Sequence, residues 1–163
     1  MKPVYQKVID KDNGDCMQAV MASLLELPLE EVPEFITFGR KWFSTLYEFV
    51  GKHDFKYDGM VHNKKYQALF NMSADCFKKP KFHSSTIISK KKLYKENGIN
   101  GFFFASVLSP KYADLKNMET HAVICDKDYN IIHDPNPNYK NLIQYPLANI
   151  IGYNGIVGVC LIN

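Results

Sequence analysis

The chain has 163 residues, of which 46% are hydrophobic and 13% aromatic. This length and composition suit one domain with a sizeable core, and they exclude a disordered chain and a tiny disulfide scaffold. The longest apolar runs are far shorter than the roughly 18 residues that a membrane-spanning helix needs. The first residues, MKPVYQ, include no apolar stretch of the kind that marks a signal peptide. We therefore expect a cytoplasmic protein with no membrane contact.

The net charge of +3 conceals a strongly basic middle segment. Residues 64–95 carry nine lysines and one acid, whereas residues 1–63 carry 7 basic and 10 acidic groups. Two interpretations remain open for the Lys64–Lys95 segment: a solvated face, or a footprint for an anionic partner such as nucleic acid. All nine basic residues are lysine, which disfavours a specific phosphate site because arginine supplies the bidentate donor fork. The richness in Lys, Asn, Ile and Tyr is typical of AT-rich genomes, including those of bacteria and phages.

Helical signals dominate the first 98 residues. Asn13 and Gly14 indicate a turn, Asp15 is a natural N-cap, and apolar residues then follow a 3.6-residue period from Cys16 to Leu27. Proline at the next position ends the pattern, because proline pushes the residue before it out of the helical region. We therefore expect a helix that begins at Cys16. Further helical segments are expected over 28–32, 38–51, 64–77 and 89–98.

The pattern changes after Gly98 to short apolar runs bounded by turn residues. Strands are predicted over 101–108, 121–126, 131–134 and 155–162. No linker or internal repeat divides the chain, so we predict one domain over 1–163, with 1–98 mainly helical and 99–163 mainly strand. Helices followed by strands favour an α+β fold with a largely antiparallel sheet.

Cys16 stands out among the four cysteines because it begins the best-defined helix. The unsatisfied N–H groups and the dipole at a helix N-terminus favour an anion, which is what a thiolate nucleophile requires. The alternative is that Cys16 is a small buried hydrophobe, as lone cysteines on apolar helices usually are. Cys125 and Cys160 lie in apolar strand-like runs and are expected in the core, and Cys76 has no assignment.

His121 and Asp134 lie on two successive predicted strands. If the hairpin turns at Lys127 and Asp128, His121 lies directly opposite Asp134, within cross-strand contact distance. A four-residue loop would shift the pairing by two and keep both on one face, whereas a bulge would disturb it. A carboxylate beside an imidazole orients the ring and favours its protonated form. The alternatives are a structural histidine and a turn acid before Pro135.

The combination of these residues is more informative than each alone. A cysteine at a helix start, followed by a distant histidine and then an acid, has the role order of a nucleophile, a base and an orienting group. Gln6 could donate a side-chain hydrogen bond beside the Cys16 N–H and complete an oxyanion hole; the alternative is an ordinary polar strand residue. The histidines and cysteines have no zinc spacing, and the glycines form no phosphate-binding loop, so we expect no metal and no cofactor.

These segments resemble the papain-like cysteine peptidases, and in particular the branch that processes double-glycine bacteriocin leaders. The similarity covers Gln6 with residues 13–25, and the stretch from His121 through His133, Asp134 and Pro135. Small phage and bacterial proteins with a Gly-Asp-Cys start are also similar. The chain has Met17 and Thr120 where the leader peptidases commonly have glycine. The resemblance implies a papain-like fold with the nucleophile helix packed on a C-terminal antiparallel sheet. It also implies Cys16 as nucleophile, His121 as base, Asp134 as orienting group and Gln6 as oxyanion donor.

We therefore expect a cysteine hydrolase that cleaves an amide, isopeptide or thioester bond through an acyl-enzyme intermediate. The same residues could serve an acyltransferase or a deamidase. The expected partner is a protein or peptide substrate, for which an acidic character is one option, and nucleic acid is the less favoured partner. The alternative function is a non-catalytic or acyl-transferring protein of the same fold that binds an anionic partner through Lys64–Lys95.

Overall fold

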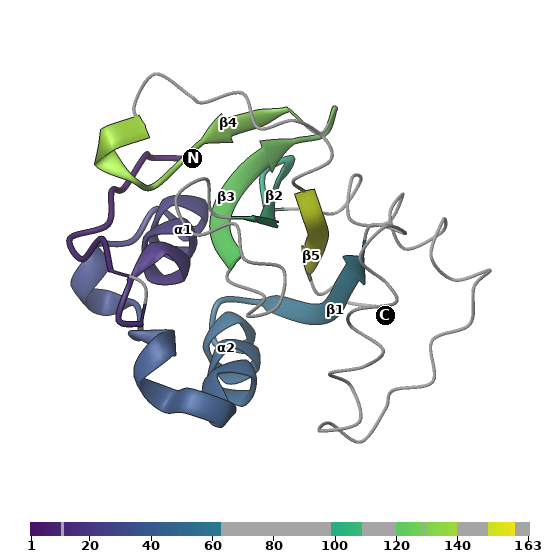
Figure 1. Cartoon of the computed structure of the whole chain (residues 1–163). Coiled ribbons are helices and arrows are strands. Elements are labelled where there is room, and N and C mark those ends of the chain that lie inside the picture. The colour runs from purple at the N-terminus through teal and green to yellow at the C-terminus, as the bar shows by residue number, and fades with distance from the viewer. Residues whose placement is uncertain (11, 63–98, 109–119, 129, 140–149, 159–163) are drawn as a thin grey trace, which may run out of the picture.

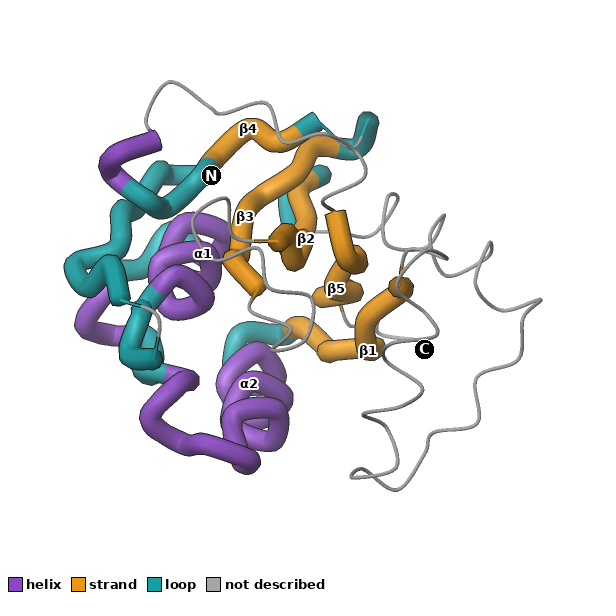
Figure 2. Tube along the Cα trace, in the orientation of Figure 1, coloured by secondary structure: helices purple, strands orange, loops and turns teal. Residues whose placement is uncertain are grey.

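A computed structural model describes residues 1–10, 12–62, 99–108, 120–128, 130–139 and 150–158 (Figures 1 and 2). The basic segment Lys64–Lys95, the helices expected over 64–77 and 89–98, and Cys76 and Cys160 all lie outside these residues. The described part combines helices with an antiparallel sheet, so the predicted α+β class is confirmed.

Helix α1 spans Cys16–Leu25, so it begins at the predicted residue. Its buried side is built largely of small and medium apolar residues, which let the helix approach the sheet closely. Glu26 then adopts a left-handed conformation with φ 59°, and its backbone N–H bonds the Ala22 carbonyl. This C-cap ends the helix at Leu25, two residues before the predicted end at Leu27.

Three helical elements follow before the sheet begins. The short 3₁₀ helix η1, Leu29–Glu31, matches the extra turn expected after Pro28. A second 3₁₀ segment, η2, spans Phe35–Lys41 and leads into helix α2, Trp42–Gly51. Helix α2 buries Leu46, Phe49 and Val50 and packs against β1 (Figure 1).

The sheet has five strands in the order β1-β5-β2-β3-β4, and every neighbouring pair is antiparallel. The strands are β1 (Phe55–His62), β2 (Phe102–Leu108), β3 (Thr120–Asp126), β4 (Ile131–His133) and β5 (Ile150–Gly158). Strand β1 is not predicted from the sequence. Asp58 and Gly59 interrupt its alternation, at the place where the pairing with β5 shifts register between Tyr57 and Gly59.

The sheet divides the apolar residues between its two faces. Phe104, Ala122 and Ile124 pack with helix α1 in the larger cluster. The residues between them along β2 and β3 form the second cluster, which consists of Phe103, Ala105, Val107, Val123 and Cys125. This alternation is the two-residue period of a strand, and it fixes which side of β3 faces helix α1.

The hairpin between β3 and β4 differs from the register expected with a two-residue turn. Cys125 pairs with Ile131 and Ile124 pairs with His133, with an irregularity between the two pairs. The Asp126 carboxylate accepts hydrogen bonds from the Asp128 and Asn130 N–H groups, at 2.8 and 2.9 Å, and holds a longer loop. At Ile124 and His133 the pairing is shifted by two from the register of a two-residue turn, as expected for a longer loop, so Asp134 does not lie directly opposite His121 in the ladder.

Candidate active site

The turn before helix α1 presents Cys16 at the helix start. The Asp10 carboxylate accepts the N–H groups of Asp12 and Asn13, at 2.9 and 2.8 Å. A side chain at Gly14 would bring its Cβ within 2.5 Å of the Asp10 carbonyl oxygen, so only glycine can occupy this position without a shift. The expected turn is present, and it lies at Asp12 and Asn13, one residue earlier than predicted.

Asp15 occupies the N-cap position of α1, but its side chain does not cap the helix. Its carboxylate is buried and accepts the backbone N–H groups of Lys7 at 2.9 Å and Val8 at 3.0 Å. The prediction of a side-chain N-cap is therefore corrected. The carboxylate instead fastens residues 7 and 8 beside the residue that carries the thiol.

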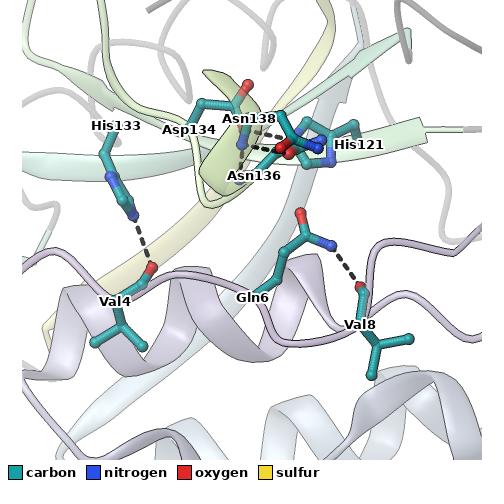
Figure 3. A network of polar contacts seen from close by, with 8 residues as sticks. All are labelled: Val4, Gln6, Val8, His121, His133, Asp134, Asn136 and Asn138. Carbon is teal, nitrogen blue, oxygen red and sulfur yellow. Dashed lines mark hydrogen bonds and ion pairs between the residues drawn. The ribbon is translucent and has the colours of Figure 1, made fainter. Parts of the chain in front are cut away.

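His121 and Asp134 form the closest polar contact of the site. The His121 Nε2 atom lies 2.7 Å from the Asp134 Oδ1 atom, and the Asp134 side chain is fully buried (Figure 3). The same oxygen accepts the Asn136 N–H at 2.8 Å. Asp134 follows the last residue of β4, so the turn after the strand, and not the ladder, brings the carboxylate to the ring. The two residues that were expected to be neighbours are neighbours.

The His121 ring also contacts the Cys16 thiol. Burial lowers the pKa of His121, but hydrogen bonds to Asp134 and to Cys16, together with the charges of both groups, raise it to about 9. The structure thus brings a half-buried thiol, an imidazole and a buried carboxylate together at one site.

Gln6 lies against the turn that follows Asp134. Its backbone N–H donates to the Pro135 carbonyl at 2.9 Å, and its side-chain Nε2 donates to the Val8 carbonyl at 2.7 Å. Its Oε1 atom is buried and has no hydrogen-bond partner among the described residues. In Figure 3 this oxygen points toward the side of the site where His121 and Asn136 lie. The Gln6 amide has a second N–H, which the bond to Val8 does not use.

His133 has a structural role that was not predicted from the sequence. It is buried, and its Nε2 atom lies 2.9 Å from the Val4 carbonyl oxygen (Figure 3). A carbonyl only accepts, so Nε2 carries the proton. Burial lowers the pKa of His133. Its ring also meets the Tyr5 ring edge-on, with centroids 5.2 Å apart. His133 therefore fastens the N-terminal segment to the end of β4.

Cys16 opens onto a cavity of about 430 Å³, which the sequence alone does not indicate. The cavity lies between α1, η2, α2, β2 and β3, and residues from all five elements line it. Gln18 is among them, and its buried amide donates to the Leu29 and Val32 carbonyls at 2.9 and 2.7 Å. A glutamine on an otherwise apolar helix face is the signal that could have identified this contact between α1 and η1.

The remaining cysteine in the described ranges is structural. Cys125 is fully buried in β3, as expected, and burial raises the pKa of its thiol to about 12. In the same ranges, no group of three or more His, Cys, Asp or Glu residues is arranged to hold a metal ion.

Comparisons with known proteins assign no function to these residues. No protein-family model matches the chain, and neither the curated proteins nor the solved structures contain a significant match. Within the described residues, no helix has the length and apolar character needed to cross a bilayer.

Proposed function

We propose that the protein is a papain-like cysteine hydrolase that cleaves an amide, isopeptide or thioester bond through an acyl-enzyme intermediate on Cys16. The observation that carries the proposal is the 2.7 Å contact between the His121 ring and the buried Asp134 carboxylate, with the Cys16 thiol close enough to act on the same ring. A thiol, an imidazole and an orienting carboxylate in this order are the parts that nucleophilic acyl transfer requires.

Acylation uses the charge state that the site favours. With the pKa of His121 at about 9, the ring is protonated near neutral pH. In the proposed step, the Cys16 sulfur attacks as a thiolate beside this ring. The sulfur attacks the substrate carbonyl carbon and forms the new C–S bond. His121 then gives its proton to the leaving nitrogen, or to the leaving sulfur of a thioester, as the scissile bond breaks.

Deacylation returns the site to its starting state. The His121 ring, now neutral, takes a proton from a water molecule, and the hydroxide oxygen attacks the thioester carbon. The C–S bond breaks, the carboxylic acid leaves and the thiolate is restored beside the imidazolium. An amine in place of the water would give acyl transfer, and a side-chain amide as substrate would give deamidation.

The negative oxygen of the tetrahedral intermediate needs donors near Cys16. The backbone N–H at the start of α1 is one, because the Asp15 side chain does not cap the helix. The second is Gln6, whose amide keeps one N–H beyond the bond to Val8. Each such donor is typically worth a factor of about 10²–10³ in turnover.

The alternative function, binding of an anionic partner such as nucleic acid through Lys64–Lys95, depends only on the charge of that segment. Steep salt dependence of retention on heparin, with no acylation of Cys16, would favour it. The His121–Asp134 pair beside the Cys16 thiol favours the hydrolase, with a protein or peptide as substrate.

An activated ester tests the proposal. Incubation with p-nitrophenyl acetate should release nitrophenol in a burst, and mass spectrometry should find one acetyl group on Cys16. Cys16→Ala should abolish the burst with the fold retained, and Cys16→Ser should be nearly inactive. Cys125→Ala, which removes the other described thiol, should keep the burst. A burst that persists in Cys16→Ala would rule out the proposed nucleophile.

A further inference from the structure

The turn that follows β4 contains two successive bonds from a side-chain oxygen to a backbone N–H. The Asp134 Oδ1 atom accepts the Asn136 N–H at 2.8 Å, and the Asn136 Oδ1 atom accepts the Asn138 N–H at 3.0 Å. A proline, Pro135 or Pro137, stands between acceptor and donor in each case. Proline has no N–H, so the first donor after each acceptor is two residues on. The sequence Asp-Pro-Asn-Pro-Asn thus forms two Asx turns in a row.

The first of these turns holds the carboxylate that meets His121. The Asp134 side chain is fully buried, and burial of a carboxylate is costly unless donors satisfy it. The His121 Nε2 atom, at 2.7 Å, and the Asn136 N–H, at 2.8 Å, both reach the Oδ1 atom of this carboxylate. The direction of the Asn136 N–H therefore limits the directions in which Asp134 can meet the ring.

The second turn holds Asn136 itself. Asn136 is 9% exposed and precedes the short 3₁₀ helix η4, Pro137–Tyr139, so its side chain occupies the N-cap position. Asparagine suits this position because its short side chain can accept a backbone N–H of the first turn. Rotation of the backbone that withdrew the Asn136 N–H from Asp134 would also break the bond to Asn138. In Figure 3 the two bonds follow one another along the turn beside His121.

The same turn is bonded to the N-terminal segment on both sides of the carboxylate. His133 lies 2.9 Å from the Val4 carbonyl through its Nε2 atom, and the Pro135 carbonyl accepts the Gln6 N–H at 2.9 Å. These bonds hold the residues directly before and after the carboxylate. Asn136 extends this restraint to the N–H that meets the carboxylate oxygen.

We propose that Asn136 is a positioning residue of the candidate active site, whose side chain keeps the Asp134 carboxylate turned toward the His121 ring. This inference rests on the proposed function and extends it to the residue that aims the carboxylate. A catalytic group is effective when the residues around it fix its orientation. A cap that only stabilised η4 would leave the protonation of the His121 ring unchanged.

NMR titration of the His121 ring in the whole chain distinguishes these two roles. The wild-type ring should titrate at about pH 9, because Asp134 and Cys16 raise its pKa. Asn136→Ala removes the oxygen that holds the turn, so the ring should titrate at a lower pH. The rate of acetylation by p-nitrophenyl acetate near neutral pH should fall about 10- to 100-fold, as expected for a misplaced catalytic group. Asn136→Ser offers a short oxygen acceptor again and should restore most of both quantities.

Asn138→Ala is the matched control in the same turn. Asn138 is exposed, and the backbone N–H that it gives to Asn136 is retained in alanine, so neither quantity should change. His121→Ala identifies the ring signal among the five histidines of the chain. Asn136→Ala that folds, titrates as the wild type does and is acetylated at the wild-type rate would overturn the inference.

Asn136→Gly gives the same comparison if Asn136→Ala does not fold. Glycine also lacks the oxygen, and it is better tolerated than alanine at the start of a helix. The titration of His121 does not depend on turnover, so the two proposals can fail separately. Absence of the burst in the wild type would refute the proposed function. A normal wild-type burst, with an unmoved titration in the glycine or alanine variant, would refute only the positioning role of Asn136.

Discussion

His121 is under opposing influences, and their balance sets the chemistry of the site. Burial favours the neutral ring, whereas the Asp134 carboxylate and the Cys16 sulfur favour the imidazolium, and their combined effect raises the pKa to about 9. The Asp134 side chain is fully buried and hydrogen-bonded to both His121 and the Asn136 N–H, so the acceptor cannot readily rotate away. The ring is therefore held in one orientation and one charge state near neutral pH.

This balance predicts an alkaline limit to activity. Cleavage of an amide needs the His121 proton for the leaving nitrogen, so kcat/KM should fall as pH rises through about 9. Asp134→Asn removes the negative charge that supports the imidazolium, and the alkaline limb should move to lower pH. Activity should drop by roughly 10²–10⁴-fold, in the range of a misoriented base. The pH profile of both proteins checks this, and an unchanged alkaline limb in Asp134→Asn would contradict the role of the carboxylate.

The same shift predicts how stability depends on pH. The folded-state pKa of about 9 lies above the ordinary value of 6.5, so folding favours the protonated ring. The stabilisation is complete below about pH 6.5 and is lost as pH rises to about 9. Chemical denaturation of the wild type across this window should show a falling free energy of unfolding, and Asp134→Asn should flatten the fall. Equal slopes for the two proteins would contradict the ion pair.

At the scale of elements, residues 1–10 are the part that joins helix α1 to the turn after β4. This segment has almost no regular structure, yet its backbone is bonded on both sides. Val4 contacts Ser23 of α1 through its N–H at 2.8 Å and His133 through its carbonyl at 2.9 Å. Gln6 then bonds Pro135, and residues 7 and 8 bond Asp15. The segment thereby sets Gln6 relative to both Cys16 and Asp134.

Asp15→Asn tests whether the hydrogen bonds from residues 7 and 8 to Asp15 position this segment. An asparagine offers one oxygen where the carboxylate offers two, so one of the Lys7 and Val8 N–H groups would lose its acceptor. We expect a loss of about 1–3 kcal/mol in stability and, because Val8 holds the Gln6 amide, a reduction in kcat larger than any change in KM. Asp12→Asn, at an exposed residue of the same turn, is the control. Unaltered kcat in Asp15→Asn would show that the segment does not position the site.

Gln18→Ala tests the hydrogen bonds that join α1 to the segment around η1. The Gln18 amide is buried and donates to the Leu29 and Val32 carbonyls, so alanine would leave both acceptors unsatisfied. The expected cost is about 2–4 kcal/mol, seen as a lower denaturation midpoint with an unchanged slope. Glu30→Ala, at an exposed residue of η1, should shift the midpoint little. A loss below about 0.5 kcal/mol in Gln18→Ala would exclude the fastening role.

Across the whole molecule, local signals predict elements well and contacts less well. The start of α1 at Cys16 and strands β2 to β4 follow from capping, proline and periodicity. Strand β1 does not follow from these signals, because the irregularity between Tyr57 and Gly59 interrupts the alternation of its residues. The strand is identified only by its pairing with β5. His121 and Asp134 were expected to meet across a ladder, and they meet through a turn instead. The loop held by Asp126 decides this register, and no periodicity reveals it.

In the candidate site, too, some residues are predictable from the local sequence and others only from the packing. Cys16, His121 and Asp134 are predictable as a set because each residue type suits its role and its local position. The carboxylate of Asp15, the buried His133 and the cavity next to Cys16 depend on segments far apart in the chain. Their roles follow from packing alone, so sequence reasoning could name Asp15 as a cap but could not place its side chain.

The rate of Cys16 alkylation by iodoacetamide near neutral pH, measured with and without the His121 ring, tests the central claim most directly. The thiolate stabilised by His121 should react at least about tenfold faster than Cys125, whose buried thiol has a pKa of about 12, and faster than Cys76 and Cys160. His121→Ala should slow Cys16 by about tenfold or more and leave the other cysteines unchanged. Cys16 reacting no faster than the other three, at a rate that does not depend on His121, would contradict the account.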